Sequence, residues 1–266
     1  MIYNQSSMFS QPPQKPKNRV IYEPKGRARE YAALACNVYN GCDHQCTYCY
    51  APDVTRKTQA EFDASRLRFG LLDKLAHDCA EYQGTSVRVL LSFTCDPYQH
   101  LDVTHQITRK AITTLHNHGI AVEVLTKGGS RALRDLDLFT SRDAFASTLT
   151  TLSPSDWEPN AASPKDRMDT IRQFHAAGIP TWVSLEPVLD PATSLEIIRR
   201  TTDFVDVFKV GTLNHHPHAQ TINWPKFAQD SVNLLTSLGY TRNPNADNLK
   251  AGDFYVKRDL AHHLKG

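Results

Sequence analysis

Past residue 30, short runs of β-branched and aliphatic residues alternate with longer segments of helical periodicity, and this alternation constrains the fold more than any other feature. It is typical of repeated βα units on a parallel sheet. Six strands are predicted, at Ala33–Val38, Val87–Phe93, Ala121–Thr126, Ala144–Thr150, Thr181–Leu185 and Val205–Val210. Six helices are predicted, at Ala60–Glu81, Thr104–Asn117, Arg131–Leu136, Lys165–Ala177, Ser194–Thr201 and Pro225–Leu238.

The residues at helix boundaries support this pattern. Ser163 is a suitable N-cap, Pro164 occupies the first helical position, and Gly178 ends the same helix. Six units in 266 residues fit an incomplete barrel better than a closed eight-unit barrel, which takes about 250 residues by itself. We therefore predict an α/β fold, a partial (β/α)6 TIM-like barrel, with an open doubly wound sheet as the alternative. In either fold the functional site lies at the carboxyl ends of the strands.

The barrel is expected over residues 31–240, between a flexible basic N-terminal arm at 1–30 and a C-terminal extension at 241–266 that packs on it. The arm has six basic residues between positions 15 and 29 and one acid, Glu23. It is suited to contact phosphates, and the alternative is a solvated basic tail. The whole chain balances 30 Lys and Arg against 28 Asp and Glu, and a net charge of +2 is no nucleic-acid signature.

The chain has no segment of roughly 18 to 20 continuous apolar residues, the length that a membrane span needs. Its N-terminus also lacks the apolar core of a signal peptide. We therefore predict a cytoplasmic protein with no membrane partner, whose thiols stay reduced and free to bind metal. The six cysteines do not suggest a disulfide framework, because three of them fall within eight residues.

These three cysteines follow the first predicted strand with the spacing CxxxCxxC: Cys42, Cys46 and Cys49. A structural zinc site normally takes four ligands. The candidates for a fourth ligand are Cys36, His44, His215, His216 and His218. The spacing of bacterial ferredoxins does not match. Three cysteines on a cluster of four irons would leave one iron open for a substrate or cofactor, so the residues alone allow either zinc or an iron–sulfur cluster.

The segment Asn37–Pro52 (NVYNGCDHQCTYCYAP) resembles the radical S-adenosylmethionine (SAM) superfamily, whose motif is CxxxCxΦC with an aromatic residue at Φ. Here the aromatic residue is Tyr48. The segment looks most similar to the group that includes spore photoproduct lyase. Other segments match this group in the same order: Thr94–Asp102, Leu125–Gly128, Thr148–Leu152, Trp157–Arg167 and Ser184–Val188. The resemblance covers about residues 30 to 215.

The resemblance implies a [4Fe-4S] cluster held by the three cysteines, with SAM chelating the fourth iron. Electron transfer then cleaves SAM into methionine and a 5′-deoxyadenosyl radical that abstracts a substrate hydrogen, while the protein positions the cofactors and excludes water. It implies cofactor-binding roles for Tyr48, Tyr50, Asp96, Lys127, Thr148 and Ser184. It also implies a role for Lys127 near the SAM carboxylate and for Glu186 as a SAM or substrate contact, and we predict catalytic roles for Lys127, Glu186 and, from the chemistry of its thiol, Cys95.

Cys95 departs from the group's pattern. Spore photoproduct lyases carry a hydrogen-donating cysteine in this loop, and its position aligns with Phe93, two residues before Cys95. Cys95 is therefore either a hydrogen donor in a neighbouring position or a small buried residue. Cys36 and Cys79 are interpreted as core residues.

Three functions follow as hypotheses. The first is a radical SAM enzyme, lyase-like or a transferase, that acts on a nucleic-acid lesion and receives electrons from a donor such as flavodoxin or ferredoxin. The second keeps this chemistry but takes a peptide or a small metabolite as substrate. The third is a non-enzymatic, zinc-stabilised nucleic-acid-binding domain.

Overall fold

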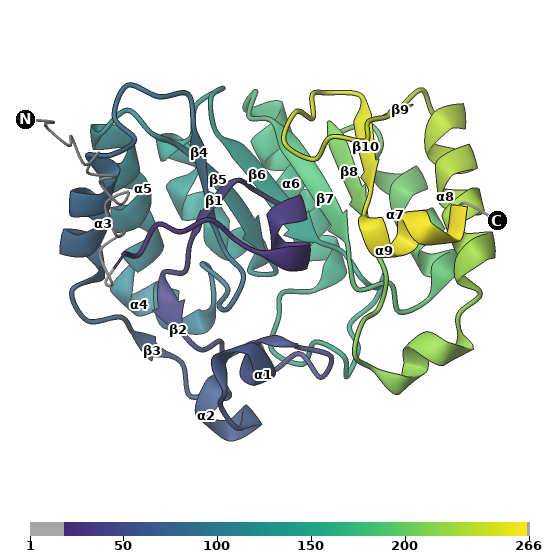
Figure 1. Cartoon of the computed structure of the whole chain (residues 1–266), viewed down its shortest axis with the longest axis horizontal. Coiled ribbons are helices and arrows are strands. Elements are labelled where there is room, and N and C mark those ends of the chain that lie inside the picture. The colour runs from purple at the N-terminus through teal and green to yellow at the C-terminus, as the bar shows by residue number, and fades with distance from the viewer. Residues whose placement is uncertain (1–18, 265–266) are drawn as a thin grey trace, which may run out of the picture.

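A parallel sheet of eight strands organises the chain in a computed structural model, which describes residues 19–264 (Figure 1). The strands are, in sheet order, β1 (Leu34–Cys36), β4 (Arg88–Leu91), β5 (Ala121–Thr126), β6 (Ala144–Thr148), β7 (Thr181–Leu185), β8 (Val207–Val210), β10 (Asp253–Val256) and β9 (Thr241–Arg242). A separate antiparallel pair joins β2 (Tyr39–Asn40) to β3 (Arg66–Leu67).

The order of the strands decides between the two predicted folds. From β1 to β8 the strands of the large sheet lie side by side in chain order, each parallel to the next. A doubly wound sheet reverses its strand order at a switch point, and this sheet has no such reversal before β8. The observed order is that of a partial barrel, as predicted. All six predicted strands are present, each within two residues of its expected bounds.

Helices cover the outside of this sheet (Figure 1). The longer ones are α3 (Leu71–Cys79), α5 (Ile107–Asn117), α6 (Pro164–Ala176), α7 (Pro191–Thr201) and α8 (Trp224–Ser237). The short α-helices are α1 (Ala51–Thr55), α2 (Gln59–Asp63), α4 (His100–His105) and α9 (Arg258–Ala261). The 3₁₀ helices are η1 (Gly26–Glu30), η2 (Gly129–Leu138), η3 (Pro217–Thr221) and η4 (His262–Leu264).

Two of the predicted helices are interrupted. The segment Ala60–Glu81 contains α2, β3 and α3, because Gly70 adopts a left-handed conformation with φ of 64° and starts a new helix. The segment Thr104–Asn117 is divided at Gln106, which has φ of 51° between α4 and α5. Helical periodicity continues across both breaks, so the pattern alone could not locate them.

Alternate residues of each strand face opposite sides of the sheet. On β6, Phe145 belongs to the main apolar cluster, which also contains residues of the covering helices. Ala144 and Ala146, on the other face of β6, belong to a second, smaller cluster that includes Trp182 of β7. The second cluster therefore forms the interior of the partial barrel.

The described part of the basic arm, residues 19–30, packs against the fold. Val20 and Ile21 are buried, and their backbone N–H groups donate to the Asp78 carboxylate at 2.6 and 3.0 Å. Tyr22 forms a backbone bridge with Ala35 and so covers the outer edge of β1. This part of the arm is an element of the fold because it buries apolar residues and protects a strand edge. Residues 1–18 of the predicted arm lie outside the described residues.

The basic side chains of this segment are also engaged within the protein. Arg19 pairs with Glu81, Arg27 with Asp259, and Arg29 with Asp247. These three arginines are therefore partly neutralised, which reduces the charge that the segment could offer to phosphates.

The described part of the C-terminal extension, residues 241–264, extends the sheet. Strand β10 runs parallel to β8, with Phe254 opposite Phe208 and Val256 opposite Val210, and the yellow strand lies beside β8 in Figure 1. Phe254 is fully buried. The four-residue strand is too short for its periodicity to be distinguished from a loop in the sequence.

We predict that replacing Phe254 with alanine lowers the free energy of unfolding by about 3–5 kcal/mol, because the substitution removes a fully buried aromatic side chain. Urea unfolding measures the change. Phe69→Ala is the matched control, since the Phe69 side chain is 98% exposed and its loss should change stability by less than about 0.5 kcal/mol. Equal effects of the two substitutions would contradict the placement of β10 in the core.

Candidate functional site

The three cysteines of the CxxxCxxC motif lie in one loop between β2 and α1, which we call the cysteine loop (residues 41–50). The loop begins with Gly41 at φ of 85°, and a Cβ atom there would lie 2.2 Å from the Phe62 carbonyl oxygen. Glycine is therefore required at this position. The next residue, Cys42, donates its N–H to the same oxygen at 3.0 Å. These contacts fix the start of the loop against α2.

The segment between β6 and α6 holds the other side of the cysteine loop. The Thr47 N–H donates to the Trp157 carbonyl at 3.0 Å. Asn160 contacts the loop twice, donating its backbone N–H to the His44 carbonyl at 3.3 Å and its side-chain amide to the Asp43 carbonyl at 3.2 Å. Segments more than 100 residues apart in sequence thus form one unit at the carboxyl ends of the strands.

A buried ion pair lies beneath this unit. The Glu158 carboxylate accepts hydrogen bonds from the Tyr48 hydroxyl and from the Arg167 guanidinium, the latter at 2.5 Å. Arg167 is only 1% exposed, and it also donates to the Thr148 carbonyl at 3.0 Å and to the Ala162 carbonyl at 2.8 Å. A buried pair with these additional hydrogen bonds is well compensated. Tyr48 of the cysteine loop is therefore anchored to β6 and α6.

Glu158 had no assigned role in the sequence analysis. It lies in the segment Trp157–Arg167 that carries part of the family resemblance, so the sequence contained a signal for it. Its function as the partner of both Tyr48 and Arg167 depends on contacts across 110 and 9 residues, which no local pattern reveals.

Burial raises the pKa of all three thiols of the motif, and that of Cys46 to about 12. The thiols also interact with one another, since a charged Cys46 would raise the pKa of Cys42 and a charged Cys49 that of Cys46. Thiolates at these positions therefore need a cationic partner, such as a metal ion or a metal cluster.

Lys127 is a cation beside the aromatic residue of this loop. Its Nζ lies 5.6 Å from the centre of the Tyr48 ring. Burial opposes its protonation, but the charges of Cys46 and Glu158 outweigh burial and raise the pKa of Lys127. Lys127 is therefore a cation at neutral pH, located beside the cysteine loop at the end of β5.

Asp96 positions this lysine. The buried Asp96 carboxylate accepts from the Lys127 backbone N–H and the Thr126 hydroxyl, both at 2.6 Å, and from the Tyr98 N–H at 2.8 Å. Burial works against ionisation, but His44 and these hydrogen bonds outweigh burial and lower the pKa of Asp96. The Asp96 carboxylate thus accepts hydrogen bonds mainly from the protein itself and joins the ends of β4 and β5. Thr126 is a partner that the sequence analysis missed.

The candidates for a fourth ligand are engaged elsewhere. The His44 ring lies between Asp96, 3.5 Å from Nδ1, and Arg131, 2.7 Å from Nε2. Burial lowers the pKa of His44 to about 4. His218 contacts the Leu189 carbonyl at 2.8 Å through Nε2, and the ring of His216 packs against Trp157.

The two remaining candidates also lie apart from the motif. His215 contacts Arg27 at 2.9 Å through Nε2, and Cys36 is completely buried on β1. Among residues 19–264, no three His, Cys, Asp or Glu side chains are grouped so as to hold a single metal ion. The motif thus offers three thiols, and the side chains considered as a fourth protein ligand have other partners.

Ser184 and Glu186 lie together at the end of β7. The Tyr31 hydroxyl contacts the Ser184 hydroxyl at 2.9 Å and donates to the Glu186 carboxylate at 2.5 Å. The same carboxylate accepts from the ammonium group of Lys257, which is almost fully buried. Tyr31 and Lys257 were not predicted as site residues, because they come from the N-terminal segment and from the end of β10.

The other predicted residues occupy different environments. Tyr50 follows the motif and is 44% exposed, whereas Thr148 is buried at the end of β6. Cys79 is a buried core residue, as predicted. Cys95 lies in the main apolar cluster between sheet and helices, and its sulfur accepts the Tyr39 N–H at 3.4 Å. Burial raises the pKa of Cys95 to about 12, so its thiol stays protonated.

Curated relatives of the chain carry no named activity. Protein MJ0683 of Methanocaldococcus jannaschii is 23% identical over 195 residues, which cover 69% of this chain and 71% of that protein. Protein Rv2578c of Mycobacterium tuberculosis is 27% identical over 170 residues, 59% of this chain. The chain spans about half of the mycobacterial protein's length, 50%. Both are described as uncharacterized.

Solved structures share the fold. Spore photoproduct lyase complexed with a dinucleoside spore photoproduct superposes with a TM-score of 0.59 at 15% identity, over 77% of this chain and 62% of the lyase. SuiB of Streptococcus suis, bound to S-adenosylmethionine, gives a TM-score of 0.58 at 11% identity, over 87% of this chain and 52% of SuiB. The family model of the radical SAM superfamily matches residues 36–205, which include the cysteine loop and strands β4 to β7. The chain therefore belongs to the radical SAM superfamily, whose members use SAM and an iron–sulfur cluster.

Proposed function

We propose that this radical SAM enzyme holds a [4Fe-4S] cluster through Cys42, Cys46 and Cys49 and acts on a nucleic-acid lesion. The observation that carries the proposal is the cysteine loop itself, which presents three thiols at the carboxyl ends of the strands, while His44 and the other histidines considered as a fourth ligand are engaged elsewhere. This donor set fits an iron–sulfur cluster with one iron left for SAM. It fits four-coordinate structural zinc less well.

The bound cofactors would supply one-electron cleavage of SAM to methionine and a 5′-deoxyadenosyl radical, with the electron coming from a flavodoxin or ferredoxin. The residues of the chain would bind SAM and orient it. Lys127 is suited to bind the SAM carboxylate, since its ammonium group is a point charge beside the loop. Tyr48 is held by Glu158 and packs near Trp157, with ring centres 6.4 Å apart, so on this side of the site two aromatic rings would limit the access of water.

The end of β7 would complete the site. Glu186 accepts hydrogen bonds from Tyr31 and Lys257, so its carboxylate is held in one orientation. Ser184, Tyr50 and Thr148 lie at or near the same strand ends and are proposed SAM or substrate contacts. A hydrogen-donor role of Cys95 stays a prediction. The Cys95 side chain lies in the main apolar cluster between sheet and helices.

A nucleic-acid substrate is supported by the similarity in fold to spore photoproduct lyase. Basic side chains that could contact phosphates lie beside the cysteine loop: Arg56 and Arg66 are exposed and Lys57 is half-buried. They offer more accessible charge than Arg19, Arg27 and Arg29, which form ion pairs. A peptide or a small metabolite is the alternative substrate.

We predict that Cys46→Ala abolishes iron and sulfide binding after anaerobic reconstitution and the reductive formation of 5′-deoxyadenosine, because two thiolates cannot hold the cluster. Iron content and chromatographic assay of 5′-deoxyadenosine are the measurements. Cys79→Ala, which removes a buried thiol of the helix layer, should retain the parent's iron content. Equal iron content in the Cys46→Ala and parent proteins would contradict the assignment.

We predict that Glu158→Gln lowers the free energy of unfolding by about 3–5 kcal/mol, because the Arg167 charge is left buried without its partner. Urea unfolding measures the loss. Adding Arg167→Met in the same chain should restore part of the stability, since no unpaired charge remains. Glu196→Gln, which breaks an ion pair on the exposed face of α7, is the control and should change stability by about 0.5 kcal/mol. An effect of Glu158→Gln as small as that of the control would contradict the anchoring role.

We predict that a UV-irradiated DNA duplex increases the rate of 5′-deoxyadenosine formation over that with the same duplex undamaged. Binding of the duplex should weaken steeply with salt, because phosphate contacts release counterions. Equal rates with both duplexes, together with stimulation by a peptide mixture or a metabolite extract, would favour the alternative substrates while leaving the radical chemistry in place.

A further inference from the structure

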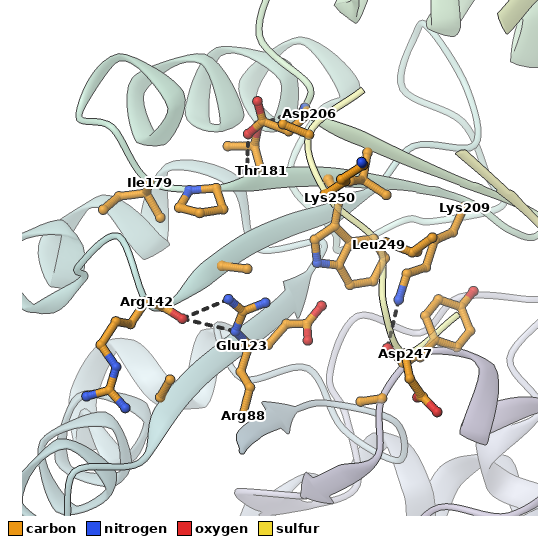
Figure 2. Close-up of a pocket in the computed structure, with 18 of the residues that line it drawn as sticks. Arg88, Glu123, Arg142, Ile179, Thr181, Asp206, Lys209, Asp247, Leu249 and Lys250 are labelled. Atoms are coloured by element: carbon orange, nitrogen blue, oxygen red, sulfur yellow. Dashed lines mark hydrogen bonds between the residues drawn. The ribbon is translucent and has the colours of Figure 1, made fainter. Parts of the chain in front are cut away.

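A cavity lies at the opposite end of the barrel from the cysteine loop. It has a volume of about 810 Å³ and is lined at the amino-terminal ends of the strands, by residues such as Arg88 of β4, Ala121 of β5 and Thr181 of β7 (Figure 2). Leu249 and Lys250, from the loop before β10, form one wall. The volume lies in the range of small-molecule sites, and the mechanism proposed above makes no use of this cavity.

Small residues create this space. The lining at this end includes Ala33, Ala121 and Ala144, whereas closed eight-stranded barrels usually carry bulky branched residues that fill the interior. The indole ring of Trp182 and the side chain of Leu249 supply apolar walls. The cavity is therefore a consequence of the sequence at inward positions of several strands.

Tyr31 separates the cavity from the candidate functional site. Its hydroxyl contacts Ser184 and Glu186 at the carboxyl ends of the strands, whereas its carbonyl oxygen accepts from the Lys209 ammonium at 2.7 Å. Lys209 lines the cavity. The two sites thus lie on opposite sides of one tyrosine.

Lys209 is a buried charge without a close anionic partner. It is only 3% exposed, and among the described residues no carboxylate forms an ion pair with it. Its Nζ lies 4.4 Å from the centre of the Trp182 ring. Burial lowers the pKa of Lys209 to about 8. The charges of Glu123 and Asp247 raise this pKa, whereas the positive charges of Lys257 and Arg88 lower it further. A buried ammonium with one carbonyl acceptor is undercompensated and attracts an anion.

Other charges around the cavity favour the same kind of ligand. Asp247 is paired with Arg29, and Asp206 accepts from the backbone N–H of Thr181 at 2.7 Å. Besides Glu123, the remaining charged side chains of the lining are basic: Arg88, Arg142, Lys209 and Lys250. Figure 2 shows Arg88 and Glu123 on the side of the cavity opposite Lys250. The buried indole N–H of Trp182 also has no acceptor among the described residues.

We propose that this cavity binds a small organic anion, whose carboxylate pairs with Lys209 and whose apolar body packs against Trp182 and Leu249. The site goes beyond the proposed radical chemistry and does not depend on it. Binding depends on both parts of the ligand, because Lys209 pairs with the carboxylate and the alanine-lined interior accommodates the apolar body.

Calorimetric titration of the full chain with benzoate tests this, with benzyl alcohol as the uncharged analogue and inorganic phosphate as the anion without an apolar body. We expect benzoate to bind at one site. Benzyl alcohol and phosphate should each bind at least about tenfold more weakly than benzoate. Lys209→Met should weaken benzoate binding about tenfold while leaving benzyl alcohol unaffected. Ala144→Leu, which fills the interior, should weaken both.

Lys226→Met on the exposed face of α8 is the matched control and should leave benzoate binding unchanged. Urea unfolding verifies that each variant folds, and Lys209→Met should be no less stable than the parent because it removes a buried charge. Absence of benzoate binding at millimolar concentration, equal binding by the Lys209→Met variant, or equal binding of phosphate and benzoate would each overturn the proposal. Cluster content is measured separately, so these outcomes do not bear on the radical chemistry.

Discussion

The ion pair between Arg167 and Glu158 is the interaction on which the geometry of the candidate site depends. It connects the start of α6 to the β6–α6 segment, and through the Tyr48 hydroxyl it reaches the cysteine loop. Both charged side chains are buried, so each needs the other. Trp157 and Asn160, in the same segment, hold the loop backbone. One internal ion pair therefore helps to orient the cysteine loop of the candidate site.

The interior of the partial barrel separates two candidate sites, one at each end of the strands. At the carboxyl ends, the polar side chains of Asp96, Lys127 and Glu186 follow β4, β5 and β7, and the parallel arrangement brings these ends to one side of the sheet. At the amino-terminal ends, small residues leave a cavity beside Lys209. Tyr31 contributes to both ends, because its hydroxyl donates to Glu186 at the carboxyl ends and its carbonyl oxygen accepts from Lys209 beside the cavity.

Much of the fold could be predicted because the signals are local. The six strands β1, β4, β5, β6, β7 and β8 are short, mostly apolar runs that alternate with segments of helical periodicity, and the caps of α6 are read directly from Ser163 and Gly178. Strand β10 was missed because four residues have no distinct period. Its place beside β8 depends on the burial of Phe254. The breaks at Gly70 and Gln106 were missed because helical periodicity continues across them.

The sequence by itself determined the family and the chemical motif, because thiol spacing and the aromatic residue at Tyr48 are properties of eight consecutive residues. It also determined which polar residues end the strands. Only the tertiary structure decided the partners: Glu158 for Tyr48, Tyr31 and Lys257 for Glu186, and the buried position of Lys209. These contacts join residues from 71 to 155 positions apart, and local propensity contains no information about such pairs.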